Sequence, residues 1–133
     1  ECGMLVVRAN YFGFGAPSGL FDADELRHGL HGGDAETSLL LHLRPELVRT
    51  AALADFAGLP ARLAAQGGVL GAEKPVGFGW MSQDLNAAGV CGNAAAATAE
   101  KGRTYFDFIV SMLLQLIAEC AALPADTLRR RPD

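Results

Sequence analysis

The sequence predicts an α/β fold in which short strands alternate with helices and pack in layers. Two β-type apolar runs, over residues 4–9 and 76–80, predict the strands. Helical patterns over 34–43 and 94–122 separate and follow them, and this alternation is typical of layered α/β proteins. Two strands are few for a complete α/β domain, so we expect this chain to hold only part of such a fold.

The composition is that of a soluble globular protein and fits a single domain over residues 1–133. Half of the residues are apolar and 20% are charged. A formal net charge of −4 argues against nucleic acid as a partner. Three consecutive arginines, Arg129–Arg131, lie within 124–133, which we expect to form a flexible, solvated tail.

The cysteines and the apolar runs favour a cytoplasmic protein without a membrane partner. Cys2, Cys91 and Cys120 form neither a CxxC motif nor an even disulfide framework. The longest apolar run, Phe108–Ala118, is too short to span a bilayer, and no signal-peptide pattern opens the chain. The chain begins with Glu1 and enters a strand almost at once, so we expect upstream sequence to be missing.

The first half of the chain contains a loop followed by three helical patterns. Tyr11–Gly19 is rich in glycine and aromatic residues, and is either a functional loop or a surface connection with inward-packed rings. Asp34–Leu43 predicts a helix with a leucine face, interrupted by Pro45. A short helical continuation over 46–54 and a further helix over 59–66 follow.

The second half is dominated by one long helix. It is predicted from Ala94 to Ala122, and apolar residues recur at helical spacing along its second half, so we expect one deeply buried face. Gly102 either kinks this helix or permits close packing. Glu100 and Lys101 are expected on a solvated face.

The glycine-rich turn at His31 carries the strongest chemical signal. Gly32 and Gly33 allow the backbone to bend freely and to approach a bound group closely. Glu36 falls in the first helical turn, where a carboxylate stabilises the helix dipole or orients the histidine, and both roles remain open. An imidazole titrates near neutral pH and can therefore take up and release a proton.

A metal site is the alternative interpretation of this segment. His28 and His31, with Asp34 or Glu36, have the residue types of a metal cluster. Glycine breaks their helical presentation and no further ligand set follows, so we expect no stand-alone metal site. We expect His42, late in the helix, to be a surface or dimer-contact residue.

Three segments together resemble the creatininase (creatinine amidohydrolase) family. His31–Ser38, with the trailing Leu39–Val48, is similar to the family's His-(Ala/Gly)-Gly-x-x-Glu-Thr-Ser segment. Gly89–Asn93 is similar to its Gly-Val-x-Gly turn, although Ala94 stands where proline is usual. Ala97–Gly102 matches its Ala-x-x-Glu-Lys-Gly helix, and the three segments follow in the family's order.

The resemblance implies a metal-dependent hydrolase of non-peptide C–N bonds whose substrate is a cyclic or other small amide. It implies a three-layer α/β/α sandwich, assembly as a homo-oligomer, and a divalent metal, zinc or manganese, in the intact enzyme. By resemblance, His31 is the general acid/base that protonates the leaving nitrogen, and Glu36 orients it or lies beside the metal site.

Other site residues are predicted with a packing alternative beside them. Trp80, Ser82 and Asp84 lie in a loop after a predicted strand and could line the substrate pocket. Trp80 could equally be a packing anchor. Gly32 and Gly33 are expected to let substrate approach the backbone. Cys91 has no neighbouring histidine in sequence, and we expect a small buried residue.

Two departures from the family pattern bear on function. The family's metal ligands lie near its N-terminus and in a mid-chain His-x-Glu, and this chain has no counterpart of either set. We therefore expect a C-terminal portion, with metal ligands supplied by a missing half or another chain. Arg27 and His28 stand where a Trp-Asp pair is frequent, which argues against specificity for creatinine itself.

Two hypotheses of different classes follow. The first is an amidohydrolase of the creatininase family. The second is a non-catalytic, truncated or degenerate paralogue that binds a small ligand or serves as an oligomerisation module. Loss of turnover on substitution of His31 supports the first, and ligand binding and assembly without a metal support the second.

Overall fold

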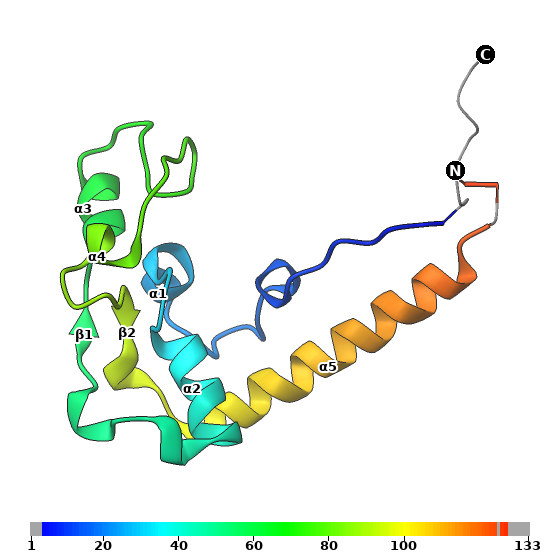
Figure 1. Cartoon of the computed structure of the whole chain (residues 1–133), viewed down its shortest axis with the longest axis horizontal. Helices are drawn as coiled ribbons and strands as arrows, with labels where there is room; N and C mark the ends of the chain where they lie inside the picture. Colours follow the sequence, from blue (N-terminus) through cyan, green and yellow to red (C-terminus); the bar gives the residue numbers. More distant parts are fainter. Residues whose placement is uncertain (1–3, 125, 128–133) are drawn as a thin grey trace.

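The computed structural model of the chain describes residues 4–124 and 126–127, and it is mainly helical (Figure 1). Its α-helices are α1 (Ala23–His28), α2 (Asp34–Leu43), α3 (Leu59–Ala65), α4 (Ser82–Leu85) and α5 (Ala99–Ala122). Its strands are β1 (Asp55–Phe56) and β2 (Gly92–Asn93), and its 3₁₀ turns are η1 (Tyr11–Phe14), η2 (Pro45–Leu47), η3 (Thr50–Ala52) and η4 (Ala94–Ala96).

Side-chain caps explain where several helices begin. Asp22 accepts a hydrogen bond from the backbone of Asp24 (2.8 Å) and starts α1. Thr98 does the same for the backbone of Lys101 (3.1 Å), so α5 begins at Ala99 and not at the predicted Ala94. The predicted bounds of α2 are confirmed.

The predicted layered sheet is not found in the part of the chain that the structure describes. β1 and β2 form a two-stranded antiparallel sheet that pairs Asp55 with Asn93 and Phe56 with Gly92. The predicted strand over 4–9 is extended and exposed, and the predicted strand over 76–80 contributes one isolated bridge, between Val76 and Leu70. A strand exists only through hydrogen bonds to a neighbour, and no described segment pairs with either run beyond that bridge.

Two helical predictions in the middle of the chain have different outcomes. The helix over 59–66 is confirmed as α3. The continuation over 46–54 is wrong, because the segment forms the separate 3₁₀ turns η2 and η3. Pro45 separates this segment from α2, and the β-branched residues Val48 and Thr50 lower its helix propensity.

The buried side chains form small clusters between the helices. Phe21 and Tyr105 meet edge to face, with ring centroids 5.1 Å apart. α2 packs on the N-terminal end of α5 (Figure 1), and a Cβ at Gly102 would lie 1.9 Å from the carbonyl oxygen of Ser38. Gly102 therefore permits close packing of the two helices and does not kink α5.

The second half of α5 does not have the buried face that its periodicity predicts. The helix extends away from the rest of the molecule (Figure 1), leaving Leu114 63% and Ile117 56% exposed. Helical spacing predicts which side chains share a face, but the elements that cover the face must come from elsewhere. By length and composition alone, α5 could cross a membrane, and a soluble protein's core helix passes the same test. Most of the predicted tail, 124–133, lies outside the described residues.

Candidate functional site

The His31 side chain is exposed on a loop that joins α1 to α2. Its backbone forms an isolated antiparallel bridge with Cys91: the His31 N–H donates to the Cys91 carbonyl (3.1 Å), and the Cys91 N–H donates back (2.7 Å). The family-like segments His31–Ser38 and Gly89–Asn93, which are far apart in sequence, are therefore hydrogen-bonded to each other. The loop that presents the imidazole is fixed by the backbone of the other motif.

Glu36 acts on the backbone directly after His31. Its carboxylate accepts a hydrogen bond from the Gly32 N–H, and the Thr37 hydroxyl donates to the Gly32 carbonyl (3.0 Å). Gly32 has a φ of +66°, a conformation that glycine adopts without strain. Glu36 therefore holds the His31 loop through the peptide group of Gly32, the residue before the N-cap Gly33.

Two tyrosines lie beside the Glu36 carboxylate. Burial raises the pKa of Tyr11 to about 12, and the charge of Glu36, the nearby Tyr105 and a hydrogen bond to Glu36 act in the same direction. Burial, followed by the charge of Glu36, also raises the pKa of Tyr105. The two rings lie edge to face, 6.3 Å apart. The loop over 11–19 therefore supplies an aromatic side chain to this site.

A buried carboxylate that sequence reasoning missed, Glu25 of α1, joins the same segments. It is 8% exposed, and its two oxygens accept hydrogen bonds from the backbone of Asp34 (2.7 Å) and Asn93 (2.8 Å). Asp34 begins α2, so the charge lies at a helix N-terminus, which stabilises an anion. A Cβ at Gly33 would lie 2.0 Å from Glu25, and Gly92 also approaches it closely. Gly33 and Gly92, one from each of the two family-like segments, were the sequence signal that a side chain from elsewhere lies between these segments.

Lys101 contradicts the prediction of a solvated face. Its ammonium lies 2.5 Å from the Asp34 carboxylate and also donates to the Ala96 carbonyl (2.9 Å). The Asp34 side chain is 1% exposed, and it also accepts a hydrogen bond from the Ser38 hydroxyl (2.9 Å). Lys101, from the family-like segment Ala97–Gly102, thus neutralises the buried Asp34 of the segment His31–Ser38. Glu100 is exposed, as predicted.

Two of the three predicted substrate-binding residues of the second half, Trp80 and Asp84, form structural hydrogen bonds through their side chains. Trp80 donates to the Ala72 carbonyl (3.1 Å) and packs against the buried cluster of which Ala72 is part. Ser82 begins α4, and the Asp84 carboxylate accepts from the backbone of Met81 (2.8 Å) at its start. The geometry gives Trp80 the role of a packing anchor. Contact of Trp80, Ser82 and Asp84 with substrate stays a prediction, and so does contact of Gly32 with substrate. Gly33 is buried in this structure.

The remaining candidates are packing residues. Cys91 is 1% exposed, and burial raises the pKa of its thiol, so it is a small buried residue as predicted and a poor nucleophile. His42 is half-buried with its ring 5.9 Å from Phe106, and therefore packs between α2 and α5 instead of lying free on the surface.

The described residues do not form a metal centre. Across 4–124 and 126–127, no group of three or more histidine, cysteine, aspartate or glutamate side chains is placed to hold a metal ion. Asp34 and Glu36 are instead engaged with Lys101 and Gly32.

Comparisons with known proteins agree with the motifs. The family model for creatininase, described as creatinine amidohydrolase, matches residues 3–117. No protein with a curated description matches this chain. A crystal structure from Bacteroides fragilis, of a protein provisionally named a creatinine amidohydrolase, is 32% identical with a TM-score of 0.68.

The alignment with that structure covers 90% of this chain and 44% of the other, so this chain spans less than half of its relative's length. Neither match supports the expectation that it is the C-terminal portion of a member. Since the family model covers most of the sequence and the fold agrees with a solved relative, the chain belongs to the creatininase (creatinine amidohydrolase) family.

Proposed function

We propose that this chain carries the proton-donating part of an amidohydrolase that hydrolyses a C–N bond in a cyclic or other small amide. The carrying observation is the His31 loop, whose peptide groups are held by Cys91, Glu36 and Thr37 while the imidazole remains exposed. A catalytic side chain requires such a supported position, because small displacements reduce proton transfer strongly.

The chemistry explains why a histidine suits this role. Hydrolysis adds water across the amide bond: the water oxygen bonds to the carbonyl carbon and the C–N bond breaks. An amide nitrogen leaves poorly as an anion, so it must gain a proton as the bond breaks. The imidazolium of His31 delivers that proton, and a proton from the attacking water restores it.

Any metal of the intact enzyme, zinc or manganese by family resemblance, would be held by residues outside the described part of this chain. The described residues do not fit such a centre, and the proton transfer assigned to His31 depends only on this chain's own groups. We propose that an additional portion of the family fold supplies the ligands, in a cytoplasmic homo-oligomer.

The test is turnover of small cyclic amides, creatinine included, with this chain in a polypeptide that completes the family fold. His31→Ala is expected to lower kcat by about 10²–10⁴-fold, the usual contribution of general acid–base catalysis, without changing Tm. His42→Gln, a conservative change at a histidine that packs between α2 and α5, is the control and should retain turnover. Unchanged turnover in His31→Ala would remove the proposed role and favour the non-catalytic, ligand-binding alternative.

A further inference from the structure

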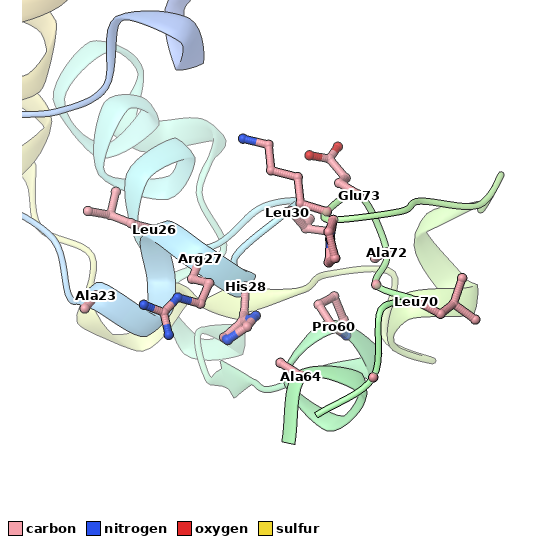
Figure 2. A pocket seen from close by; sticks show the side chains of 14 residues that line it. Ala23, Leu26, Arg27, His28, Leu30, Pro60, Ala64, Leu70, Ala72 and Glu73 are labelled. Atoms are coloured by element: carbon pink, nitrogen blue, oxygen red, sulfur yellow. The ribbon is translucent and has the colours of Figure 1, made fainter. Parts of the chain in front are cut away.

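A cavity of about 1040 Å³ lies beside α1, between α3 and the segment over 68–75 (Figure 2). Its apolar wall includes Leu26, Leu30, Pro60 and Ala72. Its size is at the upper end of small-molecule sites, and a mostly apolar lining with a few polar groups is their usual character. The cavity can therefore take a ring or short chain together with a polar substituent.

The polar lining of the cavity is mainly cationic. Arg27 and His28 extend from α1 side by side, whereas the Glu73 carboxylate points away from them (Figure 2). Lys74 also lines the cavity. Within the described residues, no carboxylate oxygen lies within 4.0 Å of a nitrogen of Arg27 or Lys74. An arginine fork without a protein partner is suited to a carboxylate, which it binds through two parallel hydrogen bonds.

The acidic groups near Arg27 lie toward a second, smaller cavity. That cavity, of about 560 Å³, shares Arg27 and His28 with the first and is lined by Asp22, Asp24 and Asp55. Those three residues do not line the larger cavity. Arg27 and His28 therefore form the wall between an acidic cavity and one whose lining charge is positive.

Residues that line the cavity directly precede the proposed proton donor in the sequence. Arg27 and His28 end α1, Leu30 lines the cavity, and His31 follows it directly. The N–H groups of Leu30 and His31 both donate to the Cys91 carbonyl, at 2.8 and 3.1 Å. A ligand held at Arg27 is thus bound by the same short, fixed segment that presents the imidazole.

We propose that this cavity binds the substrate and that the substrate is a small amide bearing a carboxylate, which Arg27 holds. This inference rests on the proposed function, because it assigns a substrate class to the same site. The apolar wall would contact the carbon skeleton, Lys74 would add positive charge around the carboxylate, and the His28 ring would offer a hydrogen-bond donor.

Two lactams with the same five-membered ring provide the test: pyroglutamate, which carries a carboxylate, and pyrrolidone, which does not. Binding of each to the chain is measured by titration calorimetry or by NMR shifts. Pyroglutamate should bind at least about tenfold more tightly, the scale of one charge-assisted bidentate contact. Arg27→Gln should remove this preference, and Arg49→Gln, the same change at an exposed arginine outside the cavity, should retain it.

The proposal is overturned if the two lactams bind equally, if neither binds, or if Arg27→Gln keeps the preference. These experiments distinguish an error in the proposed substrate class from an error in the proposed function. Equal binding of the lactams with turnover still lost in His31→Ala rejects only the carboxylate. If Arg27→Gln loses the carboxylate preference while His31→Ala keeps its turnover, the cavity still binds the carboxylate. The role of His31 as proton donor is then rejected.

Discussion

At the scale of single residues, Gly33 lies too close to the buried Glu25 carboxylate to accept a side chain. Gly33→Ala is expected to destabilise the fold by about 2 kcal/mol or more, because the new Cβ would meet a buried carboxylate that already holds two backbone N–H groups. The measurement is the midpoint of urea unfolding. Gly79→Ala is the matched control, since a Cβ there meets nothing within 4 Å, and it should change stability by less than about 1 kcal/mol. Equal effects of the two substitutions would contradict the close packing of Gly33 against Glu25.

The Tyr11 hydroxyl reports on Glu36. The Glu36→Gln substitution removes a negative charge and is expected to lower the Tyr11 pKa from about 12 toward its ordinary value, although burial will keep it raised. Absorbance at alkaline pH measures this, with Tyr105→Phe removing the signal of the other tyrosine. A raised folded-state pKa also means that this group's contribution to stability is present below about pH 10 and is lost as pH rises through about 12. An unchanged Tyr11 titration in Glu36→Gln would show that the two groups do not interact.

At the scale of elements, α2 and α5 are joined by a partly buried ion pair. Lys101→Met should destabilise the fold by about 3 kcal/mol, because it leaves the Asp34 carboxylate without its cation in a site that is 1% exposed. Thermal unfolding measures the loss, and Arg103→Met, on an exposed position of the same helix, should have little effect. If Lys101→Met is neutral, Asp34 must be stabilised by Ser38 and the helix N-terminus alone.

The outcome for each element follows from whether its determinants are local. The bounds of α2 and the existence of α3 were predictable, because leucine periodicity, glycine and proline act within a few residues. The strands over 4–9 and 76–80 were not, because their apolar composition says nothing about a pairing partner. The site divides in the same way: Glu36 was placed correctly in the first turn of α2, whereas the contact of Glu25 with Asn93 joins residues far apart in sequence.

At the scale of the whole molecule, the described residues expose a large apolar surface. Met4–Val7 and the second half of α5 are exposed, and the chain spans 44% of its solved relative. Large exposed apolar patches are rare on soluble monomers and mark interaction surfaces. The periodicity of α5 predicted correctly which side chains share one face, whereas the prediction that this face is deeply buried is wrong for the residues that the structure describes.

The exposed face of α5 predicts association of the isolated chain. Leu113, Leu114 and Ile117 are each about half exposed, and burying the remaining half of such a side chain contributes about 1 kcal/mol apiece. Sedimentation should therefore detect oligomers, and Leu114→Glu with Ile117→Glu should weaken association at least about tenfold without lowering Tm, since neither side chain is buried. Gln115→Glu, between them on the same helix, is the control and should associate as the parent does. A monomeric parent chain would contradict the prediction, and flotation with lipid vesicles in place of self-association would assign the face of α5 to a membrane surface.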